Sequence, residues 1–365
     1  MAFDASDSTA MLRALELARL GEGRVEPNPM VGAVVTTGPA DGEPAGRVVA
    51  EGWHARFGGP HAEAAALAAA GAAARGGTLY VTLEPCCHEG KTPPCTDAVV
   101  AAGIRRVVVA ARDPFPAVDG RGIEALTAAG IRVEVGLHER EAVRLTAPFR
   151  KLVTTGRPWV IAKWAMSLDG RVATGARDDR WISSEASRAL VHELRGRVDA
   201  IVVGIGTVLA DDPLLTPRPA GVREPLRIVL DGRARLPMGS RLVQTAREAP
   251  LLVAVGPHAP ADRCRAIEDA GGVVWHHPAA DPAERVDALL AELGSRRLTN
   301  VLVEGGPAVL RSLFDRRAID EVWAFVAPKI IGGDGPALPD APPIDFEQID
   351  HPGGDILVRG LVRRA

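Results

Sequence analysis

Cysteine is scarce in this sequence: its 365 residues include only four. The chain also lacks a basic arm and an acidic tail, and its formal net charge is -3. General nucleic-acid binders usually carry a clustered positive stripe, so the charge pattern argues against that class. No apolar run reaches the length of a membrane span. We therefore expect neither a nucleic-acid nor a membrane partner.

A secretory signal is also missing, because acidic residues and then a helical pattern occupy the first 21 positions. This predicts a cytoplasmic protein, in which thiols stay reduced. Hydrophobic residues make up 47% of the chain and charged residues 24%, which is typical of a globular protein. The length is sufficient for two domains with sizeable cores.

Helix-like and strand-like segments alternate in the first half. Helices are predicted over 9–20, 61–76 and 96–103, and strands over 28–36, 78–85 and 105–114. This alternation predicts a mostly parallel sheet covered by helices.

The second half repeats the alternation after a charged stretch at 138–158, so we place the domain boundary near residue 150, giving domains 1–150 and 151–365. The buried strands predicted there are 159–170, 199–204, 225–232, 249–256, 299–306 and 322–331. A Pro-rich segment at 332–343 is predicted to be a surface loop.

Three of the four cysteines lie in one loop, PCCHEGKTPPC at 85–95. They could form a disulfide with a spare thiol or belong to a metal site, and a reducing compartment disfavours the disulfide. One imidazole and two thiolates balance the charge of Zn²⁺ and fill three tetrahedral positions, leaving the fourth to water. We therefore predict that His61, Cys86 and Cys95 bind one catalytic zinc ion per chain. Helix N-termini at the site would favour the thiolate of Cys95.

Glu63 lies two residues beyond His61 and is well placed to move a proton from the zinc-bound water to a substrate. H-x-E followed by P-C…C is the pattern of zinc-dependent base deamination. Cys87 would close the site as a fourth ligand, but adjacent side chains diverge, so we interpret it as a bystander. A purely structural zinc module is the alternative, and it predicts that Glu63 is dispensable.

The first half resembles one enzyme family in four motifs: HAE at 61–63, PCCHEGKTPPC, PNPMVGAVV at 27–35 and ARDPFPAVDGRGI at 111–123. They resemble the deaminase half of the bifunctional riboflavin-biosynthesis deaminase/reductase (RibD) family. The eight residues between Cys86 and Cys95 are similar to this family, whereas cytidine and tRNA-adenosine deaminases have two. The resemblance implies a phosphorylated pyrimidine substrate bound by Asn28, His88, Lys91 and Asp113. The chain departs from the family at Cys87, commonly Ser, and Phe115, usually Asn.

The second half lacks a G-x-G-x-x-G motif, so a Rossmann domain is not expected. Instead, VLVEGGPAVLRSLF at 301–314 predicts a strand, a Gly-Gly turn and a helix, where backbone N–H groups can approach a phosphate. KWAMSLDGRVATG, VVGIGTVLADDPLLTPR, VEGGP and APKIIGG then occur in the order of the family's reductase domain. That domain resembles dihydrofolate reductase in fold.

The resemblance implies NADPH as the hydride source. It implies that the cofactor is held by Met166, Trp181, Thr207, Asp211, Gly232, Gly306, Pro307, Ala308, Val309, Leu310, Arg311 and Ser312. The substrate contacts that it implies are Lys163, Asp179, Arg195, Leu215, Arg218 and Glu304. At positions 179 and 232 the family usually has Ser.

Some of these roles also make chemical sense. Arg195 and Arg218 could hold a ribose phosphate, and Glu304 could accept hydrogen bonds from the substrate. Lys163 and Asp211 are the polar residues expected nearest to hydride transfer. Arg233 or Arg235 could meet the 2′-phosphate of NADPH or be ordinary surface residues.

Taken with the residues, the resemblance implies an α/β protein with an N-terminal cytidine-deaminase-like three-layer α/β/α domain and a C-terminal dihydrofolate-reductase-like α/β domain. Its expected reactions are zinc-dependent deamination of 2,5-diamino-6-ribosylamino-4(3H)-pyrimidinone 5′-phosphate and then NADPH-dependent reduction of the ribosyl group to ribityl. The alternative is a zinc deaminase of another nucleotide or nucleic-acid base with a fused nucleotide-binding domain. If the protein were a nucleic-acid editing enzyme, we would expect a basic surface and a short spacing between the two cysteine ligands. We also expect a homo-oligomer.

Overall fold

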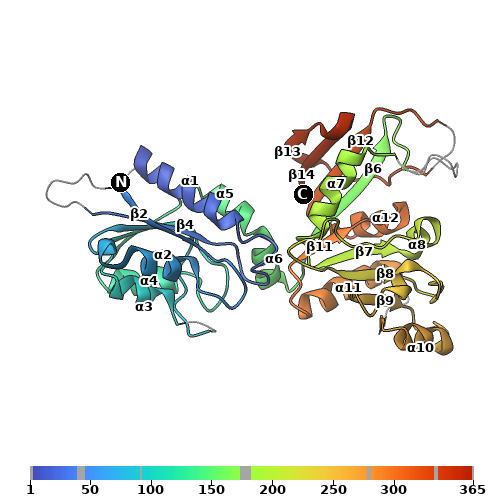
Figure 1. The fold of residues 1–365 in the computed structure, drawn as a ribbon, viewed down its shortest axis with the longest axis horizontal. Helices are drawn as coiled ribbons and strands as arrows, with labels where there is room; N and C mark the ends of the chain where they lie inside the picture. Colours follow the sequence, from blue (N-terminus) through green and yellow to red (C-terminus); the bar gives the residue numbers. More distant parts are fainter. Residues whose placement is uncertain are drawn as a thin grey trace. The chain divides into compact units, whose positions relative to one another are not determined.

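The computed structural model of the chain describes residues 3–38, 46–90, 93–172, 182–277, 281–332 and 336–363. The chain divides into two compact units, Met1–Gly156 and Arg157–Ala365 (Figure 1). The division falls just after helix α6 (Ala147–Thr155), whereas the boundary drawn from the sequence at residue 150 lies inside this helix. No helix within the described ranges is long and apolar enough to cross a membrane.

The first unit is built on a five-stranded sheet in the order β2-β1-β3-β4-β5. Its strands are β1 (Gly32–Thr36), β2 (Val48–Trp53), β3 (Thr78–Leu83), β4 (Arg106–Ala111) and β5 (Arg132–Val135). β3, β4 and β5 are parallel, but β1 is antiparallel to both β2 and β3. Strand β1 thus runs against the direction of the other strands of this mostly parallel sheet, because β2, which the sequence pattern missed, folds back on β1.

Helices cover both faces of this sheet, as Figure 1 shows. The helices are α1 (Ala5–Arg19), α2 (Ala62–Ala70), α3 (Cys95–Ala101), α4 (Arg121–Ala128), α5 (Glu139–Leu145) and α6, with a 3₁₀ turn η1 (Gly71–Ala74). Alternate residues of a strand point to opposite faces. Ala33 and Val35 thus pack with α2, α3 and α4, while Val34 packs with α1 and α5. The predicted three-layer arrangement is confirmed.

The second unit is built on a nine-stranded sheet in the order β10-β9-β8-β7-β11-β6-β12-β14-β13. The first seven strands in that order are parallel, and β14 and β13 are antiparallel to their neighbours. The strands are β6 (Trp159–Ser167), β7 (Ala200–Gly204), β8 (Leu226–Leu230), β9 (Leu251–Val255), β10 (Val273–His276), β11 (Asn300–Val303), β12 (Glu321–Ala327), β13 (Ile344–Asp350) and β14 (Ile356–Val362).

Helices also bury both faces of this sheet. On one face lie α7 (Glu185–Arg195), α8 (Ile205–Asp211), α9 (Arg241–Gln244) and α10 (Ala261–Asp269). On the other lie α11 (Pro282–Ser295) and α12 (Pro307–Asp315). Parallel strands buried on both faces have continuous apolar runs, which is why the sequence revealed six of them. It missed β10, which is short, β13, which is largely exposed, and β14, whose apolar run is broken by Arg359 and Gly360. The described residues 336–343 of the Pro-rich segment form no regular strand.

A buried carboxylate fixes α1 to the first sheet. Asp7, in the first turn of α1, is 3% exposed. It accepts hydrogen bonds from Arg106 on β4 at 2.6 and 2.9 Å and from the Tyr80 hydroxyl on β3 at 2.8 Å. Asp7 also forms a capping box with Asp4. The Arg106 guanidinium lowers the pKa of Asp7 from 3.8 to about 2, so the carboxylate stays charged in the folded protein.

Asp7→Asn should lower the free energy of unfolding by about 1–3 kcal/mol at pH 7, because Arg106 loses a buried hydrogen-bonded partner. Since the folded-state pKa lies below the ordinary value of 3.8, this stabilisation is complete above that value and is lost as the pH falls towards about 2. Urea denaturation at a series of pH values measures the difference between the two proteins. Glu16→Gln, which removes only an exposed pair with Arg13, is the control and should cost less than about 0.5 kcal/mol.

Candidate metal centre and cofactor site

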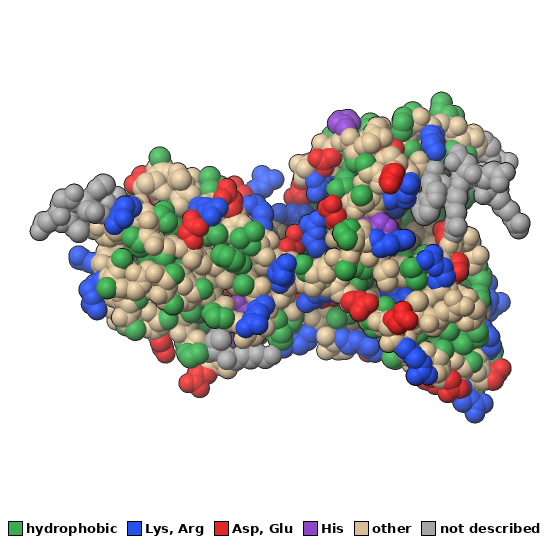
Figure 2. All heavy atoms as spheres, viewed as in Figure 1, with side chains coloured by type: hydrophobic (Ala, Val, Ile, Leu, Met, Phe, Trp, Pro, Cys, Tyr) green, Lys and Arg blue, Asp and Glu red, His purple; other side chains and the backbone are tan. Residues whose placement is uncertain are grey.

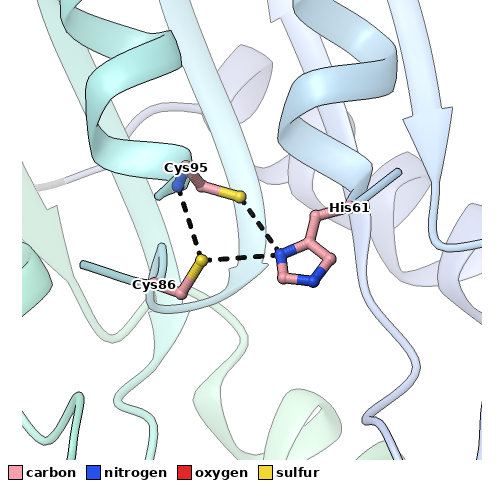
Figure 3. A group of neighbouring side chains, drawn as sticks. All are labelled: His61, Cys86 and Cys95. Carbon is pink, nitrogen blue, oxygen red and sulfur yellow. Dashed lines mark hydrogen bonds between the residues drawn. The ribbon is translucent and has the colours of Figure 1, made fainter. Parts of the chain in front are cut away.

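The predicted zinc ligands meet where two helices begin (Figure 3). His61 is the N-cap residue of α2, Cys95 is the first residue of α3, and Cys86 lies in the loop that follows β3. The His61 Nδ1 atom lies 3.2 Å from the Cys95 sulfur and 3.5 Å from the Cys86 sulfur. The backbone N–H of Cys95 donates to the Cys86 sulfur at 3.4 Å. The three residues therefore converge on one point.

These three donors fit a zinc ion. Their ligand atoms all lie within 4.8 Å of one another. Zn–N bonds of about 2.0–2.1 Å and Zn–S bonds of about 2.3 Å at a tetrahedral angle would separate nitrogen and sulfur by about 3.6 Å. The observed distances are slightly shorter, and small outward movements of the side chains would admit the ion. All four cysteines are free thiols, so the disulfide alternative is wrong.

The two sulfurs of the centre titrate in opposite directions: the hydrogen bond with Cys86 raises the pKa of Cys95, which does not follow the expectation that the helix N-terminus favours its thiolate. Hydrogen bonds from Cys95 and His61 lower the pKa of Cys86 to about 4, which favours its thiolate. Glu63, in the first turn of α2, is 3% exposed. Burial raises the pKa of Glu63 to about 7, and the negative charge of Cys86 acts in the same direction. A carboxyl group that titrates near neutral pH can both take and return a proton.

Cys87 does not join the three donors. Its thiol points to the Ala117 carbonyl oxygen at 3.8 Å, and the metal-ligand group found among the described residues does not include it. Burial raises the pKa of its thiol, which keeps it protonated. Its side chain diverges from Cys86 as expected for adjacent residues, so within the described residues no third sulfur lies at this centre.

His54, which the sequence analysis missed, orients a predicted substrate residue. The Pro60 carbonyl can only accept, so the His54 Nδ1–H donates to it at 2.9 Å. Burial lowers the pKa of His54, so the ring is neutral and its Nε2 accepts from the Asn28 side-chain amide at 3.2 Å. The ring also lies edge-on to His61, 5.4 Å between centroids. This leaves the Asn28 carbonyl oxygen to accept from a ligand. Nothing in the spacing of His54 marks it.

Glu84, also missed, holds the surrounding loops. It is 3% exposed and directly precedes the PCC motif. Its carboxylate accepts four backbone N–H groups across the segment that follows β4, those of Asp113, Gly120, Gly122 and Ile123, at 3.0–3.3 Å. A carboxylate with four donors is stable without a cation. Glu84 thus ties the Asp113 segment to the metal loop.

The other residues predicted to bind the substrate of the first unit lie in the loops that Glu84 connects. Asp113 is buried, and burial raises its pKa to about 6. Its carboxylate accepts the Phe115 N–H at 2.8 Å, and the Phe115 ring lies 5.8 Å from that of His88. Lys91 lies outside the described residues.

In the second unit, three predicted substrate residues form one charged cluster. The Arg195 guanidinium, at the end of α7, donates two hydrogen bonds to Glu304 at 2.6 and 2.9 Å. Both side chains are nearly buried, so the pair is shielded from water. Burial lowers the pKa of Lys163 on β6, opposed by the charge of Glu304. Arg195 and Glu304, expected to bind separately, thus act as one ion pair.

The other residues predicted to bind the substrate of the second unit do not belong to this charged cluster. His192, which the sequence analysis missed, lies one turn before Arg195 and bonds the Thr216 carbonyl at 3.2 Å. It thereby links α7 to the segment that carries Leu215 and Arg218. Burial lowers the pKa of His192, and the charges of Arg195 and Arg218 act in the same direction. Asp179 and Trp181 lie outside the described residues.

A cavity of about 220 Å³ lies between the second sheet and helices α11 and α12. Four predicted cofactor residues line it: Gly232, Ala308, Val309 and Ser312. Gly306 is the N-cap of α12, and a Cβ there would lie 3.8 Å from the Thr207 hydroxyl. The turn is therefore open to a phosphate at a helix N-terminus.

Other predicted cofactor residues stand apart from this cavity. Leu310 is 1% exposed with its side chain in the core, so a contact with the cofactor at this position would come from its backbone. Arg311 points to solvent, and Pro307 is the first residue of α12. Met166 lies on β6 and Asp211 ends α8, and neither lines the cavity.

Comparison with known proteins assigns both units. Residues 4–111 match the family model of the cytidine and deoxycytidylate deaminase zinc-binding region, and residues 158–352 match that of the RibD C-terminal domain. The fold and the centre thus define a zinc-dependent deaminase domain joined to a second, reductase-type α/β domain. The riboflavin biosynthesis protein RibD of Aquifex aeolicus is 40% identical over 89% of this chain and 88% of its own length. The chain belongs to the RibD family of bifunctional deaminase/reductases.

Further relatives cover the whole length. RibD of Escherichia coli K12 is 38% identical over 96% of this chain and 98% of its own. The solved structure of Acinetobacter baumannii RibD superposes with a TM-score of 0.86 at 33% identity, covering 98% of this chain and 99% of that one. A Thermotoga maritima structure described as a diaminohydroxyphosphoribosylaminopyrimidine deaminase/5-amino-6-(5-phosphoribosylamino)uracil reductase gives 0.83 at 37% identity, with coverages of 98% and 99%. Together these confirm the predicted fold class.

Cys86→Ser should remove most of the bound zinc, whereas Cys87→Ser should retain it, because only Cys86 lies among the three donors. Each variant would be dialysed against a weak chelator and its zinc content measured by mass spectrometry. The expected content is about one ion per chain for the parent and Cys87→Ser, and less than about a tenth for Cys86→Ser. Equal loss in both variants would show that Cys87 is a ligand.

Proposed function

We propose that this chain deaminates 2,5-diamino-6-ribosylamino-4(3H)-pyrimidinone 5′-phosphate and then reduces the ribosyl group of the product to ribityl. The observation that carries the proposal is the convergence of His61, Cys86 and Cys95 beside the buried carboxyl group of Glu63. It occurs in a chain that matches bifunctional relatives along nearly its whole length.

In the first reaction, Glu63 moves the protons. Zinc held by His61, Cys86 and Cys95 supplies Lewis-acid activation of water. Glu63 takes one proton from the attacking water and delivers it to a ring nitrogen, and it then takes the second proton from the new hydroxyl group and delivers it to the departing amino group. The C–O bond forms first, and the C–N bond breaks as the C=O double bond forms, so that ammonia leaves. Its pKa of about 7 allows Glu63 to act in both directions.

The substrate would be held by loops around this centre. Asn28, oriented by His54, offers a carbonyl oxygen to an N–H of the pyrimidine. Asp113 and His88 lie in the loops organised by Glu84 and Phe115. Lys91 carries the charge expected of a phosphate partner. Loop residues that a buried carboxylate holds in place can present several polar groups to a substrate without rearranging.

In the second reaction, the cluster of Lys163, Arg195 and Glu304 would hold the phosphorylated ribosyl group, together with Arg218 and Leu215. NADPH, which supplies the hydride, would be held by the turn at Gly306, Thr207 and the cavity beside α12. Desolvation strengthens the Arg195–Glu304 pair and orders its donors. The chain's task is therefore to fix the ribosyl carbon against the cofactor rather than to supply a nucleophile.

We also propose that the enzyme is cytoplasmic and homo-oligomeric and that it has no nucleic-acid partner. Four free thiols suit a reducing compartment. On the face drawn in Figure 2, acidic and basic side chains are interspersed rather than gathered by sign. Strand β13 is an edge strand with Phe346 68% and Ile349 57% exposed, a surface on which a second copy can associate.

Glu63→Gln should retain zinc but slow ammonia release by about 10²- to 10⁴-fold, because the amide cannot move protons. NADPH oxidation on the pre-deaminated substrate should continue at the parent rate. Ammonia and NADPH absorbance would be followed separately, with a chelator-treated parent as the reference for lost zinc. Full ammonia release by Glu63→Gln would instead support a zinc module without catalysis at this centre.

Glu304→Gln should lower kcat/KM for NADPH oxidation by at least about 30-fold, because it leaves the buried Arg195 guanidinium without its counter-charge. Ammonia release should stay within about twofold of the parent, since Glu304 belongs to the other compact unit. The matched control is Glu292→Gln, which breaks a surface pair with Arg296 and should leave both activities unchanged. A parallel loss of both activities would point to unfolding rather than to a role in reduction.

A further inference from the structure

We propose that Arg285 recognises the 2′-phosphate of NADPH and gives the enzyme its preference for NADPH over NADH. This assignment rests on the proposed reductase function. Arg285 lies in the first turn of α11 and lines the cavity between this helix, α12 and the sheet. No motif in the sequence points to this residue.

The cavity suits the adenosine end of a dinucleotide. Its floor is apolar and is formed by side chains from the sheet and from α11, including Val202, Ala254, Val286, Leu289 and Leu290. Its volume of about 220 Å³ is below the roughly 300–1,000 Å³ of sites that enclose a whole drug-sized ligand. It can therefore enclose one flat heterocycle while the rest of the ligand lies outside.

The position of the cavity relative to α12 supports this orientation. Gly306 caps the N-terminus of α12, where backbone N–H groups favour a pyrophosphate. Ala308, Val309 and Ser312, farther along the same helix, line the cavity. A dinucleotide with its pyrophosphate at Gly306 would thus place one nucleoside in the cavity and direct the other towards the cluster around Lys163.

The Arg285 guanidinium lines the cavity beside Gly232, and in the proposed orientation the ribose of that nucleoside emerges there. Its Nη1 atom is 3.4 Å from the point that a Cβ at Gly232 would occupy, so it lies against the backbone just after β8. A guanidinium presents paired donors that match a phosphate. The start of α11 adds a partial positive charge beside the guanidinium.

The acidic residue Asp231 lines the same cavity. Its side chain is 0% exposed, and one carboxylate oxygen accepts the Leu236 N–H at 2.7 Å. One oxygen is thus held by the loop that follows β8, and the other, Oδ1, makes no hydrogen bond within the described residues. Arg233 and Arg235, the candidates from the sequence, are exposed and do not line the cavity; the Arg235 side chain is 56% exposed and 3.9 Å from Asp231.

Two nucleotides that differ by one phosphate test the assignment. The dissociation constants of 2′,5′-ADP and 5′-AMP would be measured by calorimetry on the full chain, and KM for NADPH and NADH on the pre-deaminated substrate. Arg285→Ala should raise the dissociation constant of 2′,5′-ADP and KM for NADPH by about 10- to 100-fold. Values for 5′-AMP and NADH should change by less than about twofold, because neither carries the 2′-phosphate.

Two further variants make the test specific. Arg296→Ala, near the other end of α11 and paired with Glu292 on the surface, is the matched control and should leave all four values unchanged. Arg285→Lys keeps the charge without the paired donors and should give an intermediate loss. If circular dichroism shows that Arg285→Ala does not fold, the Arg285→Lys variant provides the test.

The possible failures are distinguishable. Tight binding of 2′,5′-ADP to Arg285→Ala, or its loss in Arg235→Ala instead, would overturn the assignment of Arg285 while leaving the reductase function intact. Equal affinity of the parent for 2′,5′-ADP and 5′-AMP would also overturn it. If the parent binds neither nucleotide and oxidises no NADPH, the proposed function fails and the assignment fails with it.

Discussion

The thiols of Cys86 and Cys95 and the imidazole of His61 lie close enough together to bind one ion because three different elements of the fold carry them. His61 and Cys95 stand at the starts of α2 and α3, and Cys86 lies in the loop after β3. Glu84, one step before the Pro-Cys pair, accepts four backbone N–H groups from the segment after β4. The metal loop and the Asp113 segment are thereby fixed to each other before any ligand binds. Such preorganisation is what a hydrolytic site requires.

The second unit relies on the same physical device, a buried charge whose partners are all supplied by the fold. Arg227 is 0% exposed, and its guanidinium donates to backbone carbonyls of Leu214, Thr245 and Ala249 and to the Thr245 hydroxyl. It thus fixes the residue that precedes Leu215. The Arg195–Glu304 pair similarly joins α7 to the turn after β11. Buried charges are costly unless satisfied, so these contacts specify loop positions that apolar packing alone leaves free.

Much of the fold could be predicted because buried parallel strands have continuous apolar runs, as in β7, β8 and β9. β2 and β13 could not, because their alternating or exposed residues give no such run. The zinc ligands were predictable because His, Cys and Pro are chemically distinctive and closely spaced. His54, Glu84 and His192 were not, because each acts through a partner distant in sequence. Leu310 is a motif position whose side chain faces the core, which its place in the motif did not reveal.

The sequence by itself determined the donor types of the metal centre, the order of the two α/β units and the family, since these depend on local spacing and composition. Only the tertiary structure decided which polar groups meet. It paired Arg195 with Glu304, turned Cys87 towards Ala117 and brought Arg285 against Gly232. The physical reason is that hydrogen bonds and ion pairs act over a few ångströms in space, and the packing of helices on a sheet sets those distances without regard to separation along the chain.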